Sequence, residues 1–141
     1  MKSATLALFS LPLMTSACGP HEILAPEKAD NIAPTILEGF ASCSGEGAEA
    51  QWTFYAKVDD VDGLEDIQEV HAYVYDESTN LQEDNFALVA TQDLALWQTH
   101  EAALNTSLDC AFANYSVDFL ATDTAGDSGE ITSWAGANLG G

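Results

Sequence analysis

Polar and apolar residues alternate along three stretches of the chain, residues 51–58, 68–76 and 114–123. A period of two is typical of β-strands, because successive side chains of a strand point to opposite faces of the sheet. The apolar rows are Trp52, Phe54, Ala56 and Val58 in the first stretch, Val70, Ala72 and Val74 in the second, and Tyr115, Val117, Phe119 and Ala121 in the third. The pattern therefore predicts three strands that each bury one face.

Weaker strand signals occur in residues 35–43, 86–91, 95–101 and 130–134. The first of these stretches follows Pro34, which suits an edge strand because proline has no N–H to donate to a neighbouring strand. Together with the three clear strands, these stretches predict an all-β domain. About seven strands in roughly a hundred residues is the size of an immunoglobulin-like antiparallel β-sandwich.

Residues 93–104 also fit a short helix. The residues that would share the apolar face of this helix are Leu96, Trp97, His100 and Leu104. We favour a strand for this segment, because it lies among other strand and turn signals.

Composition indicates one folded domain with an acidic surface. The chain has 141 residues, of which 47% are hydrophobic, enough for one packed core. Aspartate and glutamate number 23 against three lysines and no arginine, for a formal net charge of −20. Such a surface repels phosphates, so nucleic acid is not an expected partner. It attracts cationic proteins or divalent metals, or serves only as a solubilising coat, or reflects a salty habitat.

The N-terminal residues 1–17 have the layout of a secretory signal peptide, with Lys2 at the start, a short apolar stretch, and small residues before Cys18. The apolar stretch is too short to span a bilayer. Residues 15–18 resemble the lipobox of bacterial lipoproteins, with Thr15 where leucine is usual. The resemblance implies that the thiol of Cys18 carries a lipid that anchors the protein in a membrane.

Cysteine arithmetic favours this anchor over plain secretion. An exported chain with three cysteines has one unpaired thiol, unless Cys18 is lipidated and leaves Cys43 and Cys110 as a disulfide pair. Residues 18–33 then form a flexible, lipid-anchored tether, and Gly19 after the cysteine is compatible with an outer membrane. We expect a lipid-anchored protein of the cell envelope, at the outer membrane; the alternative is a secreted or periplasmic soluble protein.

Two stretches resemble bacterial immunoglobulin-like, fibronectin-like and cadherin-like domains. Residues 58–76 resemble their B strand, B–C loop and C strand, and residues 115–130 resemble the F strand, the F–G turn and the start of strand G. The resemblance implies one immunoglobulin-like sandwich over residues 34–138, with a tail at 139–141.

Within this fold, a Cys43–Cys110 disulfide would tie the first strand to the connection before strand F. Tyr115 would be the tyrosine of strand F that hydrogen-bonds back across this corner. Both features predict a stabilising role for these residues, not a redox or catalytic one.

The acidic stretch 59–66 is the most suggestive candidate for ligand chemistry. The B–C and F–G loops of an immunoglobulin-like sandwich emerge at the same end, which would bring residues 122–129 close to it. Calcium takes six to eight oxygen ligands, and cadherin-like modules often use acidic loops in this way. The expected calcium ligands are Asp59, Asp62, Asp66, Asp123 and Asp127. The competing interpretation is a set of ordinary Asp-Gly turns, because the spacing does not match an EF-hand.

The sequence carries no motif of a known catalytic site: no G-x-S-x-G, no H-E-x-x-H, no Walker loop and no paired C-x-x-C. His21 lies in the expected tether, and His71 and His100 lie on separate strands, so zinc is not expected. No cofactor is expected apart from calcium in the acidic loops.

We therefore expect a non-enzymatic binding or structural module displayed on a membrane surface, where it meets an envelope or extracellular protein. The alternatives are a calcium-stabilised, cadherin-like adhesion module and a small envelope hydrolase or hydrolase inhibitor. The sequence does not indicate an oligomeric state.

Overall fold

The computed structural model describes residues 30–112 and 114–135. Its strands are β1 (Thr35–Ser44), β2 (Gln51–Asp59), β3 (Ile67–Asp76), β4 (Leu81–Ala90), β5 (Leu96–Ala102), β6 (Tyr115–Asp123) and β7 (Ser128–Ala135). Three short 3-10 helices lie in the connections, η4 (Gly47–Glu49), η5 (Leu64–Asp66) and η6 (Ala103–Asn105). The prediction of an all-β domain with seven strands is confirmed. The predicted signal peptide and most of the predicted tether lie outside the described residues.

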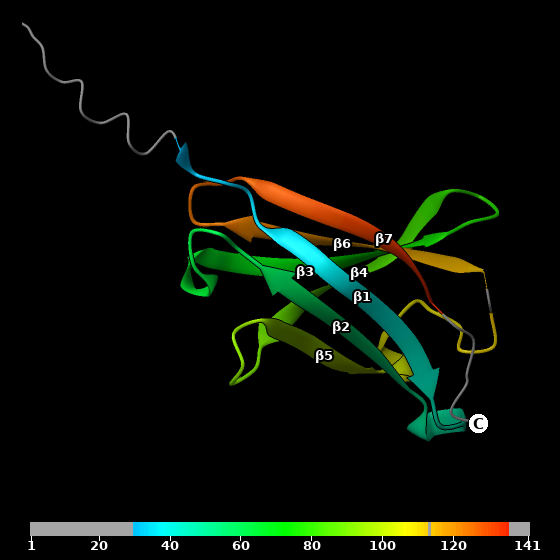
Figure 1. Ribbon diagram of the computed structural model, residues 1–141. Helices are drawn as coiled ribbons and strands as arrows, with labels where there is room; N and C mark the ends of the chain where they lie inside the picture. The colour runs from blue at the N-terminus through cyan, green and yellow to red at the C-terminus, as the bar shows by residue number, and fades with distance from the viewer. Residues whose placement is uncertain (1–29, 113, 136–141) are drawn as a thin grey trace, which may run out of the picture. The chain divides into compact units, whose positions relative to one another are not determined.

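The strands form a β-sandwich whose hydrogen bonding closes into a barrel, in the order β1-β2-β5-β4-β3-β6-β7. Neighbouring strands are antiparallel except β1 and β7, which run parallel and pair at Ala41 and Ala135. β1, β2 and β5 lie side by side in front of β3 and β6, as in the two sheets of an immunoglobulin-like domain (Figure 1). β4 joins the two layers, because it pairs mostly with β3 but also, at Val89 and Ala90, with β5.

Segment 96–102 is a strand, and the alternative of a helix there is wrong. It pairs with β2 along its whole length, from Leu96 opposite Lys57 to Ala102 opposite Gln51. The pairing explains why this segment is a strand and not a helix, because the backbone of a paired strand obtains its hydrogen bonds from the neighbouring strands.

β4 begins at Leu81, earlier than the residue 86 that the apolar pattern indicates. The first half of this strand is mostly polar and carries no alternation. A tight turn aligns it with β3 instead: Asp76 Oδ1 accepts hydrogen bonds from the N–H and hydroxyl of Ser78, and the N–H of Asn80 donates to the carbonyl of Asp76. Hairpin pairing, and not burial, therefore defines the start of this strand.

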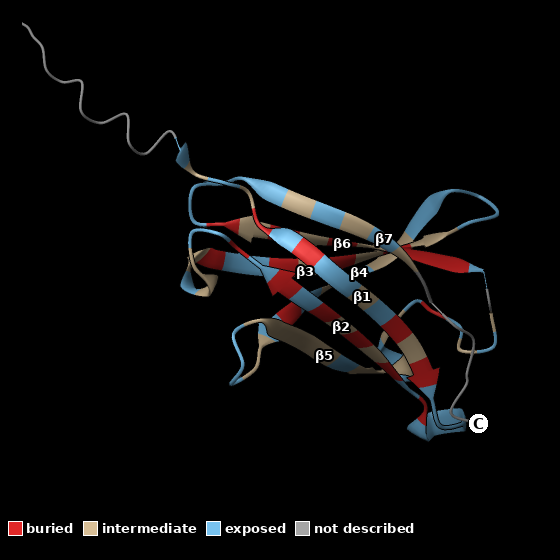
Figure 2. Ribbon diagram, viewed as in Figure 1, coloured by how far each residue is buried: buried red, intermediate tan, exposed pale blue. Residues whose placement is uncertain are grey.

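The core lies between the two layers and follows the predicted alternation. Figure 2 shows buried and more exposed residues alternating along β2 and β6. Trp52, Phe54 and Phe119 are fully buried, and Trp52 packs against Phe54 and edge-on against Tyr115, with ring centroids 6.0 and 5.9 Å apart. Trp97 is only partly buried against this core. Trp52 is thus a core residue, as expected.

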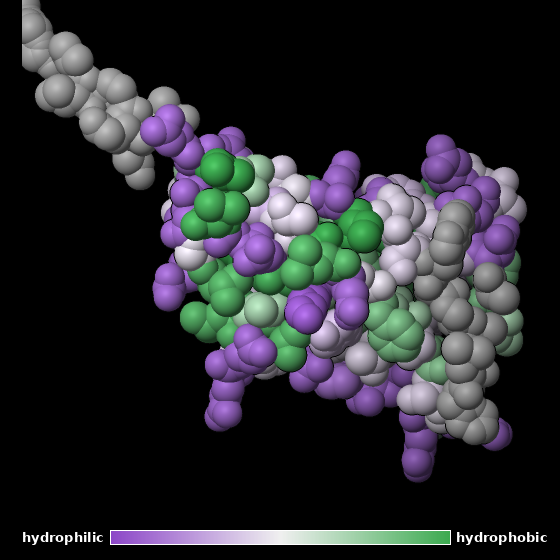
Figure 3. Space-filling view, viewed as in Figure 1, coloured by the Kyte–Doolittle hydropathy of each residue, from purple (hydrophilic) through white to green (hydrophobic). Residues whose placement is uncertain are grey.

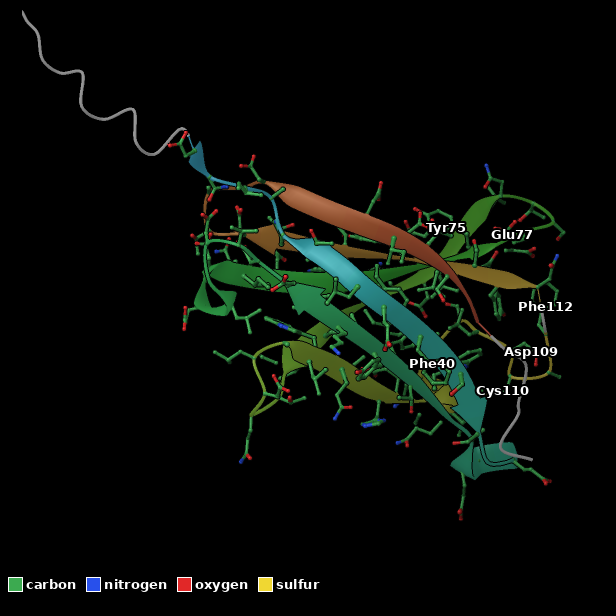
Figure 4. The ribbon with its side chains drawn as sticks, in the orientation of Figure 1. Phe40, Tyr75, Glu77, Asp109, Cys110 and Phe112 are labelled. Atoms are coloured by element: carbon green, nitrogen blue, oxygen red, sulfur yellow. A yellow bond between two sulfur atoms is a disulfide. The ribbon has the colours of Figure 1, made fainter. Side chains whose placement is uncertain are left out.

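A disulfide and a tyrosine corner close one end of the sandwich. Cys43 at the end of β1 is bonded to Cys110, with their Cα atoms 5.6 Å apart. The hydroxyl of Tyr115 accepts a hydrogen bond of 2.8 Å from the N–H of Asp109, and Phe112 packs edge-on against its ring. Figure 4 shows Asp109, Cys110 and Phe112 on the connection between β5 and β6. The predicted disulfide and the predicted hydrogen bond of Tyr115 across this corner are confirmed.

The outer face of β1 carries exposed apolar side chains. Leu37 and Phe40 are each about half exposed, at 51% and 50%. A bulge between Ile36 and Glu38 interrupts the pairing with β2 and presents both Leu37 and Glu38 to solvent. Figure 3 shows hydrophobic residues among hydrophilic ones on the face of the molecule that it displays, so this surface is not uniformly polar.

Candidate metal site

Two buried rows of the sandwich end in an aspartate. The inward row of β2 continues past Val58 to Asp60, which is only 6% exposed, and the inward row of β6 continues past Ala121 to Asp123, which is fully buried. The period of two places both side chains on the core side of their strands. Two carboxylates therefore occupy positions that apolar residues hold elsewhere in the core.

The turn after β2 positions the first of these carboxylates. Asp60 Oδ1 accepts a hydrogen bond of 2.8 Å from the N–H of Asp62, and the carbonyl of Asp60 accepts one of 2.9 Å from the N–H of Gly63. Gly63 has φ +115°, a conformation that glycine adopts without the strain of a side chain. The chain then enters η5, whose last residue is Asp66.

Three carboxylates converge at this turn. One oxygen from each of Asp60, Asp62 and Asp66 lies within 4.8 Å of the others. Oδ2 of Asp60 is buried and has no hydrogen-bond partner. Buried polar oxygens almost always have a partner, and a buried carboxylate without one is costly. We call these three residues the acidic cluster. One of its buried oxygens lacks a partner, and a bound cation would provide one.

The F–G loop lies against the acidic cluster, as the sequence predicts. The N–H of Thr124 donates to the carbonyl of Asp66 at 2.9 Å, and the hydroxyl of Thr124 donates to Oδ1 of the same residue. Asp123 Oδ1 in turn accepts hydrogen bonds from the N–H groups of Ala125 and Asp127, both at 2.9 Å. Residues 58 positions apart in the chain thus form one end of the sandwich.

Electrostatics at the site disfavour a negative charge on Asp60. Burial raises the pKa of its carboxyl, and the charges of Asp66, Asp62 and Asp123 raise the pKa further, against the opposing effect of the hydrogen bond from Asp62. Lys57 is the one lysine or arginine in residues 30–135, and it is exposed on β2. A bound cation would therefore supply the positive charge that the described side chains of this site lack.

The structure brings some of the five expected ligands to the site and leaves the others exposed. Asp62 and Asp66 belong to the acidic cluster, and Asp123 is buried close enough for its charge to act on Asp60. Asp59 is exposed and faces away from the core, and Asp127 is exposed in the F–G loop.

Asp60 is the residue that the expected ligand set leaves out. It lies in the same acidic stretch as Asp59, and charge alone does not distinguish the two. The signal that separates them is the alternation of β2, because continuing the row through Trp52 and Val58 by two residues reaches Asp60 and not Asp59.

An open pocket of about 510 Å³ lies beside the disulfide. Its walls include Gly45, Ala50, Ala103, Leu104, Leu108 and Cys110. Its lining includes none of the three aspartates of the acidic cluster, so the two features are separate.

No protein-family model, no curated protein and no solved structure matches this chain. Among the residues that the structure describes, no helix has the length and apolar character needed to cross a membrane. The fold and the site by themselves therefore define the class: a single, disulfide-bonded β-sandwich domain with an acidic cluster at one end.

Proposed function

We propose that this chain is a non-enzymatic binding or structural module whose fold a divalent cation, calcium, stabilises at the acidic cluster. The observation that carries the proposal is the Asp60 side chain, which is 6% exposed, has an unpartnered Oδ2 and belongs to a cluster of three carboxylates. A cation at this point would give Oδ2 a partner and would relieve the repulsion among the acids.

The donor set supports calcium over other metals. The acidic cluster offers only carboxylate oxygens, whereas zinc sites in proteins are built largely from histidine and cysteine. Asp62 is exposed and Asp66 is partly exposed, so water molecules can complete a coordination shell of six to eight oxygens. Magnesium requires a stricter octahedral geometry and gives up its water reluctantly, so we expect this site to bind magnesium more weakly than calcium.

We place this module in the cell envelope, anchored through a lipid on Cys18 and displayed to an envelope or extracellular protein partner. The N-terminal pattern that supports the anchor lies outside the described residues. The Cys43–Cys110 disulfide is in keeping with an oxidising compartment, because such bonds are rare in the cytosol. A secreted or periplasmic soluble form is the alternative location.

Calcium titration of the metal-free, full-length protein tests the proposal. Because the cation binds the native state and not the unfolded chain, the melting temperature should rise with calcium concentration. At a concentration about 100 times the Kd the gain is about 2.7 kcal/mol. Magnesium and a monovalent salt of matched ionic strength serve as controls, and a melting temperature that responds equally to the monovalent salt would contradict the proposal.

A further inference from the structure

The chain ahead of β1 contacts the acidic cluster through Ile32. The main-chain N–H of Ile32 donates a hydrogen bond of 2.8 Å to Oδ2 of Asp62, a residue 30 positions further along the chain. Ile32 is 49% exposed, so the hydrogen bond adds to a partial burial of this residue. The position of the Ile32 N–H therefore depends in part on where the Asp62 carboxylate lies.

The segment becomes firmly packed only two residues later. Pro34 is buried, and its carbonyl oxygen lies 2.0 Å from the position that a Cβ on Gly129 would occupy. Thr35 then starts the pairing of β1 with β2, opposite Asp59. The firmly packed chain that begins at Pro34 is thus separated from Ile32 by one residue.

The Asp62 carboxylate takes part in two interactions that depend on each other. It belongs to the acidic cluster, where the negative charges of Asp60 and Asp66 lie close by, and it accepts the hydrogen bond from Ile32. Without a cation, repulsion favours rotation of this exposed side chain away from its neighbours, which breaks the bond to Ile32. With a cation, attraction holds the carboxylate in the cluster and keeps its acceptor in place.

We infer that cation binding at the acidic cluster fixes the main chain at Ile32 through Asp62. This inference rests on the proposed function, because it requires a cation at that site. It adds a regulatory consequence: the cation-loaded domain holds the Ile32 N–H in its hydrogen bond, and the empty domain releases it.

Hydrogen exchange of single amides in the full-length protein tests the coupling directly. The Ile32 amide should exchange about three- to tenfold more slowly when calcium is added, the effect of one hydrogen bond to a carboxylate on the exposed surface. The Asn80 amide is the control, because it donates to the Asp76 carbonyl in the β3–β4 turn and also opens locally. Its exchange should not change.

The converse measurement uses a matched pair of variants. Ile32→Pro removes the N–H donor, whereas Ile32→Ala removes the side chain and keeps the donor. Since coupling between two sites is reciprocal, Ile32→Pro should weaken calcium binding about three- to tenfold, and Ile32→Ala should leave it unchanged.

The two hypotheses fail differently. Calcium binding with unchanged or faster exchange of the Ile32 amide, or with equal affinities in the two Ile32 variants, would overturn this inference and leave the proposed function intact. A titration without calcium binding would overturn both.

Discussion

The N–H of Asp62 donates a 2.8 Å hydrogen bond to Oδ1 of Asp60, and the other oxygen of this buried carboxylate has no partner. One oxygen thus stabilises the turn after β2, and the other is available to a bound cation. The two oxygens can be separated by mutation, because an asparagine retains a carbonyl oxygen for the turn and loses the negative charge.

Asp60→Asn should stabilise the metal-free protein and abolish its response to calcium. The variant keeps an acceptor for the Asp62 N–H and removes a buried charge that lies close to other acids. We expect a gain of about 1 kcal/mol, or about 4 °C in melting temperature for a domain of this size. Calorimetry in chelator and in calcium measures both effects.

Asp59→Asn is the matched control for this variant, because it removes the same charge from the neighbouring, exposed position. It should alter neither the metal-free melting temperature nor the calcium response by more than about 0.5 kcal/mol. An Asp60→Asn protein that retains the full calcium response would contradict the assignment of Asp60 as a ligand.

Tyr115→Phe should destabilise the domain by about 1 kcal/mol, because the N–H of Asp109 loses its acceptor. Burial raises the pKa of the Tyr115 phenol above its ordinary value of 10.0. The folded state therefore holds this proton more tightly than the unfolded state, and the stability that the phenol contributes is present below pH 10 and lost as the pH rises through the folded pKa.

Urea unfolding at neutral pH and above pH 10 measures this contribution. The free energy of unfolding should fall more steeply with alkaline pH in the wild type than in Tyr115→Phe. Tyr55→Phe, on the outward side of β2, is the control for loss of a phenol. Parallel pH profiles of the wild type and Tyr115→Phe would show that Tyr115 does not titrate as described.

Removal of the disulfide should cost up to about 4 kcal/mol, because the bond joins residues 67 positions apart and restricts the unfolded chain. The double variant Cys43→Ala/Cys110→Ala should unfold at a lower urea concentration than the oxidised wild type. Wild-type protein treated with a reductant should move toward the same midpoint. A reduced protein that keeps the midpoint of the oxidised one would contradict a stabilising role.

Gly129→Ala should destabilise the domain by about 2 kcal/mol or more. The added methyl group would lie 2.0 Å from the carbonyl oxygen of Pro34, and a main-chain atom cannot move aside as a flexible side chain can. The start of β1 must then separate from β7. Thermal unfolding measures the loss, with Glu130→Ala at the adjacent, exposed position as the control. A neutral Gly129→Ala variant would show that this contact is looser than described.

Cys18→Ser tests the proposed anchor in cells. The wild type should fractionate with membranes and incorporate a labelled fatty acid, and the variant should lose both properties. The double variant Cys43→Ala/Cys110→Ala should keep the label, because it retains Cys18. Unchanged fractionation and labelling of Cys18→Ser would reject the lipid anchor and favour the secreted form.

The positions of most strands could be predicted from the sequence, because the alternation of a half-buried strand is a local property of the backbone. Trp52 and Phe119 lie in apolar rows that indicate a buried face, and these rows are recognisable before the residues that cover them are known. The first half of β4 could not be predicted in this way, because its residues show no apolar pattern and are held as a strand by hairpin pairing with β3.

The region of the candidate site was predictable, and so were two of its three members, Asp62 and Asp66, whereas Asp60 was missed. The clustering of acids, and the rule that the B–C and F–G loops share one end, were enough to locate it. Neither observation says which oxygen lacks a partner. That depends on hydrogen bonds between segments as distant as Asp66 and Thr124.

By itself, the sequence determined an acidic, disulfide-bonded β-sandwich, because alternation, charge and cysteine number are properties of the chain alone. Only the tertiary structure decided that Oδ2 of Asp60 is buried without a hydrogen-bond partner, and that Ile32 is tied to Asp62. The physical reason is that burial and hydrogen-bond partnership arise where separate segments meet, whereas the face that a residue takes on a strand follows from the alternation of the sequence.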